Sequence, residues 1–156
     1  IKQKHYIYIH LPYINKINTY YMKRVLTAYF TAVIVLLAFS YAALYIAIYF
    51  FPAVAEQYFD PVYSSSEKRT WMYFAHPFIV ALALKYFWQR FRHMFKGGPV
   101  RRGAEVGLIY GLIAVLPAMW ITFSGISISI SVVATWILYG TLQGIIAGVI
   151  YAKMNP

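Results

Sequence analysis

The chain of 156 residues contains no cysteine and only four acidic residues. The absence of cysteine excludes disulfides, thiolate catalysis, iron–sulfur clusters and cysteine-ligated zinc. Charged residues make up 12% of the chain and hydrophobic residues 62%, whereas a soluble domain is about a quarter charged and about half apolar. The shortage of charge therefore excludes an ordinary soluble domain and favours an integral membrane protein.

Lysine and arginine outnumber aspartate and glutamate by 14 to 4, which gives a formal net charge of +10. In a soluble protein this charge would suggest nucleic acid as a partner. Here the basic residues lie at the ends of apolar blocks, where anionic lipid headgroups are the simpler partner. We expect contacts with anionic lipid headgroups on the cytoplasmic face, and no nucleic acid.

The sequence also lacks a phosphate loop, a nucleophile–base set, paired catalytic carboxylates and metal-ligand spacing. We therefore predict no enzymatic activity, no cofactor and no metal site. His76 is the single histidine expected within a membrane span, and bis-histidine haem would need a second buried imidazole. His93 lies at the opposite end of the same predicted helix, so a haem site is not favoured.

Four long apolar blocks, each about as long as a membrane-spanning helix, follow one another along the chain. Pro52 ends the first block, Gly97-Gly98-Pro99 follows the second, and a serine-rich stretch separates the third from the fourth. We predict an all-α, integral membrane four-helix bundle. Its spans are expected at about residues 26–51, 71–91, 103–123 and 131–151. A cleaved signal peptide is the alternative for the first block, but its apolar residues continue well past the possible cleavage site.

Residues 1–21 differ in composition from the rest and contain no glycine, alanine or valine. One hypothesis is that Met22 is the native initiator and that residues 1–21 are an N-terminal extension that is not native. The other is a basic, aromatic tail on the membrane surface. Residues 22–156 are then a single four-span transmembrane domain.

Glycines recur at every fourth position in the third and fourth blocks, so each set of three lies on one helix face. The two sets are mirror images about a turn between Gly125 and Ile126. Faces without side chains let two helix backbones approach closely in lipid. The spacing predicts a tightly packed C-terminal antiparallel helical hairpin, with six packing positions at Gly103, Gly107, Gly111, Gly140, Gly144 and Gly148. An interface with a partner is the alternative use of the same faces.

The distribution of basic residues predicts the orientation. Counting from Met22, one side receives nine basic residues and the other receives only Lys68 and Arg69. The positive-inside rule then places both termini in the cytoplasm, in the inner membrane of a bacterium. The stretch after the second block supplies five expected headgroup ligands, which are Arg90, Arg92, Lys96, Arg101 and Arg102.

Four polar residues within or beside the spans form the candidate polar site: His76, Lys85, Glu105 and Gln143. Glu105 lies one turn from Arg101, which predicts a surface ion pair, and a buried pair with Lys85 is the alternative. Lys85 is close enough to the inner boundary for its amine to reach phosphate. Gln143 flanks the glycine face of its helix, where we expect it to make an interhelical hydrogen bond.

Two functions fit these features. The first is a non-catalytic accessory or interaction subunit that works through helix packing and anionic-lipid contacts, in a homo-oligomer or a larger membrane complex. The alternative is a small oligomeric transporter or channel that uses the polar residues within the bundle. Convergence of His76, Glu105 and Gln143 on one cavity would favour transport, and dispersal to separate surfaces would favour the packing module.

Overall fold

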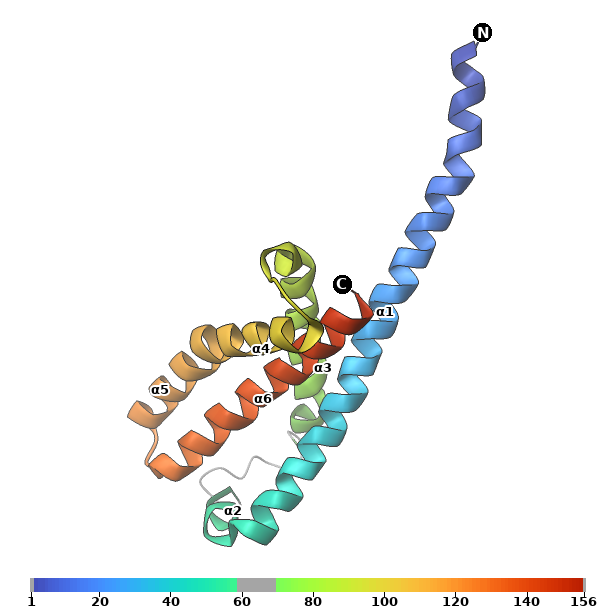
Figure 1. Cartoon of the computed structure of the whole chain (residues 1–156). Helices are drawn as coiled ribbons and strands as arrows, with labels where there is room; N and C mark the ends of the chain where they lie inside the picture. The colour runs from blue at the N-terminus through green and yellow to red at the C-terminus, as the bar shows by residue number, and fades with distance from the viewer. Residues whose placement is uncertain (1, 59–69, 156) are drawn as a thin grey trace.

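The computed structural model describes residues 2–58 and 70–155, and all the regular structure in those ranges is helical. Figure 1 shows the helices in chain order from blue to red. The all-α prediction is confirmed for this described part of the chain. The elements are α1 (Lys2–Phe50), α2 (Pro52–Tyr58), α3 (Thr70–Phe91), the 3-10 turn η2 (Arg92–Met94), α4 (Pro99–Tyr110), the π turn η3 (Gly111–Val115), α5 (Leu116–Gly125) and α6 (Ile130–Met154).

Three helical segments in the described chain are long and apolar enough to cross a membrane: Thr19–Phe50, Pro99–Gly125 and Ile130–Met154. They overlap the first, third and fourth spans predicted from the sequence, and the first predicted span ends one residue beyond Phe50. The second, α3, has 22 residues but is not among them. His76, Pro77 and Lys85 dilute its apolar run, so length and composition support three spans rather than four.

Helix α1 is much longer than a membrane crossing. Its 49 residues correspond to about 73 Å at the usual rise, whereas the hydrocarbon core of a bilayer is about 30 Å thick. The N-terminal part of α1 therefore extends beyond the other helices, as Figure 1 shows. Residues 2–21, whose composition differs from that of the rest of the chain, form one continuous helix with the first span.

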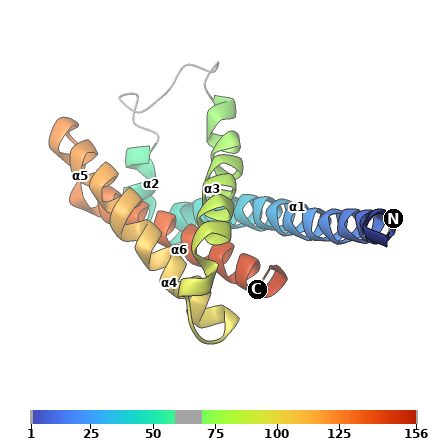
Figure 2. The same cartoon turned by 90° about the horizontal axis from the view of Figure 1, so that it is seen from above.

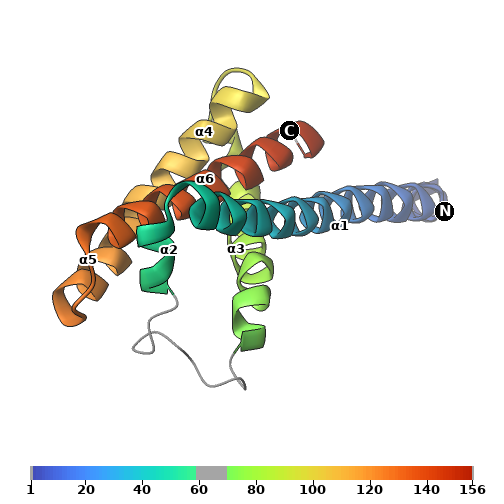
Figure 3. The same cartoon turned by 90° about the horizontal axis from the view of Figure 1, so that it is seen from below.

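Helix α6 is the centre of the structure, because it contacts each of the other five α-helices. The segment α4–η3–α5 runs antiparallel to α6 and forms with it the packed C-terminal hairpin that the glycine spacing predicted (Figure 1). Helix α1 packs along α6, and α3 contacts both α1 and α6. Figures 2 and 3 show that α3 crosses α1 steeply rather than lying parallel to it.

Small side chains make the seam between α6 and its neighbours α1 and α3. Ala28 and Ala32 of α1, Ala81 of α3 and Ala147 of α6 are all buried in one apolar cluster. Alanine permits close helix approach much as glycine does, because it projects only a methyl group. The core therefore depends on short side chains on all sides of α6, and on two large ones, Trp88 and Tyr151, at its C-terminal end.

Local sequence explains where the helices begin and end. Pro52 follows the end of α1 and starts α2, as expected from its missing N–H. Gly97 takes a φ of +101°, which glycine adopts easily, and Pro99 occupies the first turn of α4. Ser129 caps α6 by accepting a hydrogen bond from the main-chain N–H of Val132.

Candidate functional site

The glycine faces of α4 and α6 meet at two levels. A β-carbon built on Gly148 would lie 3.0 Å from the Cα of Gly103, and one on Gly144 would lie 3.0 Å from the Cα of Gly107. Gly148 and Gly144 therefore face the backbones of Gly103 and Gly107, whose own faces meet the main chain of Val149 and Ile145. No side chain fits between the two backbones there, and the pairs are those that the mirror symmetry of the sequence predicts.

The third level is displaced. A β-carbon on Gly111 would lie 2.5 Å from the hydroxyl oxygen of Thr141, and one on Gly140 would lie 3.0 Å from the side chain of Val115. Gly111 begins the π-helical segment η3, which ends two residues before Pro117. Its hydrogen bonds span five residues instead of the four of an α-helix, so the helix is locally widened. The register of α4 on α6 slips at this point, so Gly111 and Gly140 face side chains instead of each other.

The candidate polar residues lie in separate places. His76 is exposed on the N-terminal half of α3. The amine of Lys85 lies 5.4 Å from the ring centroid of Tyr29 on α1, and Glu105 accepts a hydrogen bond of 3.1 Å from Arg101. The expected Glu105–Arg101 ion pair therefore forms at the surface, and the alternative pair with Lys85 does not.

Gln143 is the fully buried member of the set, with an exposed fraction of 0%. Its Nε2 donates to the hydroxyl of Tyr139 over 2.9 Å, one turn away on the same helix. The Tyr139 hydroxyl lies 2.6 Å from Ser40 Oγ, which donates to the Leu36 carbonyl. The expected interhelical hydrogen bond of Gln143 is therefore wrong in detail, because the link from α6 to α1 passes through Tyr139.

The chain of hydrogen bonds has one consistent direction. Ser40 gives its proton to Leu36, so the Tyr139 hydroxyl must donate to Ser40 and accept from Gln143. Gln143 Oε1 is then a buried acceptor without a hydrogen-bond partner in the described structure. The network fixes α6 against α1 at this level, and its neutral members carry no charge through the bundle.

Replacing Tyr139 with phenylalanine tests this network. The substitution keeps the ring, which stacks on Phe39 at 5.5 Å, but leaves the Gln143 amide without its acceptor. We expect a loss of about 1–2 kcal/mol in unfolding free energy, measured by chemical denaturation in detergent micelles. Tyr45→Phe on the exposed face of α1 is the matched control and should change little. Equal stability of the two variants would contradict the role given to the network.

The basic residues divide into two groups at the end of the bundle where α4 begins and α6 ends. Arg24, Arg92 and Arg102 are engaged with the protein itself. Arg24 donates to the carbonyl of Met154, Arg92 donates to Asn155 Oδ1 over 3.0 Å, and Arg102 Nη2 donates to the Arg92 carbonyl over 3.4 Å. The Arg102 guanidinium also lies 4.7 Å from the ring centroid of Trp88.

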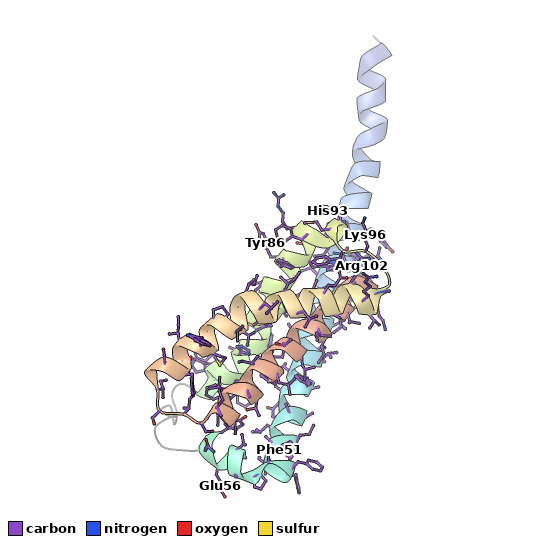
Figure 4. All side chains as sticks on the ribbon, turned by 60° about the vertical axis from the view of Figure 1, so that its left-hand side comes forward. Phe51, Glu56, Tyr86, His93, Lys96 and Arg102 are labelled. Atoms are coloured by element: carbon purple, nitrogen blue, oxygen red, sulfur yellow. The ribbon has the colours of Figure 1, made fainter. Side chains whose placement is uncertain are left out.

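The other group projects outward. Arg90, Lys96 and Arg101 are exposed, and the Arg101 side chain is 73% exposed despite its ion pair. In Figure 4, Lys96 and Arg102 lie at one end of the molecule, with Phe51 and Glu56 at the other. Of the five expected headgroup ligands, three have exposed side chains and two help to hold the fold.

This basic end contains a residue whose importance the sequence did not indicate. Trp88 has an exposed fraction of 0%. Its indole N–H donates to the Asn155 carbonyl over 2.7 Å, and its ring stacks on Phe95 at 6.0 Å. Trp88 therefore joins α3, the α3–α4 connection and the C-terminal turn, which lie far apart in sequence.

The opposite end is joined by a second set of polar contacts. Gln57 Oε1 accepts from the Ser129 hydroxyl over 2.5 Å, and the Tyr58 hydroxyl lies 2.5 Å from Thr135 Oγ1. Short helix α2 is thereby attached to the first turns of α6. No sequence pattern predicted these pairs, whose members are separated by more than seventy positions. Lys68 and Arg69, counted at this end, lie outside the described residues.

Residues 19–58 and 70–155 hold no group of three or more histidine, aspartate or glutamate side chains that could bind a metal ion. The exposed cations and the contacts of Trp88 and Arg92 make the basic end of the bundle the candidate site. Comparison of the chain with protein-family models, with curated proteins and with solved structures gives no match.

Proposed function

We propose that this protein is a non-catalytic membrane module that packs its helices around α6 and binds anionic lipid headgroups at its basic end. The observation that carries the proposal is the division of the basic residues. Arg92 and Arg102 bind the fold, while Arg90, Lys96 and Arg101 project outward from the same end. An anionic membrane surface attracts such exposed cations, by about 1 kcal/mol each.

The proposed topology has four spans with both termini in the cytoplasm of a bacterium. Under this proposal α3 is the second of the four spans, and α1 and α6 pack against it. The C-terminal hairpin in Figure 1 supports it, because α4–α5 and α6 run in opposite directions, as two successive spans do. The basic connection between α3 and α4 then lies beside the C-terminal turn, on the side that the positive-inside rule assigns to the cytoplasm.

Transport is the weaker alternative because the polar residues do not converge. His76 is exposed on α3, Glu105 pairs with Arg101 at the surface, and Gln143 is buried beside α1. A permeation path needs such groups along one route through the bundle. Their dispersal favours a module that acts through helix contacts, as an accessory subunit or a self-associating protein.

The lipid preference of the basic end can be measured with brominated lipids, which quench tryptophan fluorescence on contact. We expect the protein in vesicles to prefer phosphatidylglycerol over phosphatidylcholine. The triple variant Arg90→Gln, Lys96→Gln and Arg101→Gln should reduce that preference at least about tenfold, because three surface cations are lost. Thermal stability should change little, since these side chains are exposed.

Lys85→Gln is the matched control, because it removes a cation from α3 that lies against Tyr29 instead of facing outward. Its lipid preference should stay close to that of the unmodified protein. A protein without any preference for anionic lipid, or a triple variant that keeps it in full, would refute the proposed function.

A further inference from the structure

The α3–α4 connection is held by contacts on its inner side. Arg92 donates to Asn155 Oδ1 over 3.0 Å, and the Phe95 ring stacks on Trp88 at 6.0 Å. Phe95 packs against the apolar core, whereas Met94, which lies between Arg92 and Phe95 in the chain, is 66% exposed. The contacts on either side therefore hold the Met94 side chain outward.

Two more apolar residues of this region are exposed. Phe91 ends α3, and Val100, which is 65% exposed, lies in the first turn of α4. The Phe91 ring packs on Phe87, with the two centroids 4.9 Å apart, so it is anchored on α3. Together these exposed residues form the connection patch, which is Phe91, Met94 and Val100.

Exposed cations alternate with the connection patch along the chain. They are Arg90, Lys96 and Arg101. Residues 68–104 contain no acidic residue, and Glu105, the first acid that follows, pairs with Arg101 at the surface. In Figure 4, His93 and Lys96 of this connection lie at the same end of the molecule. Segments that lie on anionic membranes combine apolar and basic side chains in the same way.

The course of the chain places the connection patch at the level of the lipid headgroups. In the proposed topology Phe91 ends the second span, and Val100 lies at the start of the third. Apolar side chains at that level are stabilised when they leave water for the region where headgroups meet acyl chains. The exposed cations on either side of the patch are then close to the phosphates.

We propose that the connection patch inserts at the boundary between the headgroups and the acyl chains of an anionic leaflet. The inference rests on the proposed function and adds an apolar contact to its basic surface. Insertion keeps Lys96 and Arg101 near the lipid phosphates, where their attraction to the leaflet is strongest. An anionic lipid surface fits both kinds of side chain, because its phosphates meet the cations and its acyl chains meet the patch.

Nitroxide labels measure the depth of the patch in the whole protein. The chain has no cysteine, so each single cysteine variant carries one label. In vesicles that contain phosphatidylglycerol, labels at Met94→Cys and Val100→Cys should collide more often with oxygen, which concentrates among acyl chains, than with a water-soluble nickel chelate. The ratio of the two collision rates should be several-fold higher than at Tyr20→Cys.

Two exposed positions on α1 calibrate the depth scale. Ile34→Cys lies in the middle of the first span and gives the ratio for full immersion. Tyr20→Cys lies on the part of α1 that extends beyond the other helices and gives the ratio for full contact with water.

Met94→Gln tests what insertion contributes to lipid binding. Glutamine has a similar length and leaves the net charge unchanged, but it is polar. We expect the preference for phosphatidylglycerol over phosphatidylcholine to fall about threefold, because the turn moves away from the acyl chains and its cations move away from the phosphates. Met72→Gln, at the other end of α3, is the matched control, because Met72 is also exposed. Its lipid preference should stay unchanged.

Either of two results would overturn the inference while the proposed function stands. One is a Met94→Cys label that meets the nickel chelate as often as Tyr20→Cys does, or that neither reagent reaches because protein covers it. The other is a Met94→Gln variant that keeps the full lipid preference, while the triple variant of Arg90, Lys96 and Arg101 loses it. A protein without any preference for anionic vesicles would overturn the proposed function and, with it, the anionic leaflet as the partner of the patch.

Discussion

Gly107→Ala is expected to be among the most destabilising single-methyl changes in this protein, as is Gly103→Ala. The added β-carbon would lie 2.6 Å from the Cα of Ile145 on α6, and it would also meet the main-chain nitrogen of that residue. Main chain cannot rotate away as a flexible side chain can, so α4 and α6 must separate. Overpacking typically costs about 1–3 kcal/mol, and the rigid neighbour places this substitution at or above the upper end of that range.

The other glycines provide graded controls for this substitution. Gly140→Ala meets the Val115 side chain at 3.0 Å, which can adjust, so an intermediate loss is expected. The β-carbon added by Gly125→Ala would meet no atom within 4 Å, and the position is the end of α5. The unfolding free energy of this variant should therefore stay the same or rise slightly. Chemical denaturation in detergent, monitored by circular dichroism, gives the unfolding free energies of the three variants. Equal losses at all three positions would contradict the close contact of α4 and α6.

Trp88→Ala should produce the second large effect. The substitution removes a fully buried ring, its hydrogen bond to the Asn155 carbonyl and its contact with the Arg102 guanidinium. Truncating a buried tryptophan costs about 3–5 kcal/mol in unfolding free energy. Removal should also release the C-terminal turn, because Asn155 would lose one of the two groups that hold it.

Two further variants separate the parts of this effect. Trp88→Phe keeps an aromatic ring for Arg102 and Phe95 but removes the indole N–H, so a loss of about 1–2 kcal/mol is expected. Trp71→Ala removes a tryptophan that is 63% exposed on the same helix, and it should change stability little. Carboxypeptidase digestion measures how accessible the C-terminal turn is. The Trp88→Ala variant should lose its C-terminal residues faster than the Trp71→Ala variant. Equal trimming would show that Trp88 does not hold the C-terminal turn.

Local sequence patterns predicted the features that depend on neighbouring residues. The four-residue spacing of glycine predicted the C-terminal hairpin and the levels at which Gly103 meets Gly148 and Gly107 meets Gly144. The proline after Phe51 and the serines before α6 predicted helix boundaries, because a missing N–H and a capping hydroxyl act within one turn. The spacing of Arg101 and Glu105 predicted their ion pair for the same reason.

The features that sequence patterns did not predict depend on contacts over long separations. Trp88 donates to the carbonyl of Asn155 in the C-terminal turn, and no periodicity in the sequence connects these two residues. The third glycine pair was expected to match the first two. The π turn at Gly111 moved Gly111 and Gly140 out of register with each other. Pro117 indicates that the helix is distorted nearby, but it does not predict how far the register of α4 on α6 changes.

The division of the arginines could not be predicted either. Arg90 and Arg92 look alike in sequence, but they are two positions apart, and α3 ends between them at Phe91. The turn η2 directs Arg92 back toward Asn155, whereas Arg90 is exposed on α3. A short turn of this kind depends on what it packs against, and its partners come from α1 and α6.

The contact of the glycine faces is the central claim, and solid-state NMR of the protein in lipid vesicles tests it directly. With glycine labelled at Cα, the pairs Gly103–Gly148 and Gly107–Gly144 should give cross-peaks, since their α-carbons lie within about 5 Å of each other. The adjacent pair Gly97–Gly98, fixed at about 3.8 Å by the peptide bond, calibrates the intensity in the same spectrum. The structure predicts three cross-peaks of comparable strength, and a spectrum with only the calibrating one would contradict it.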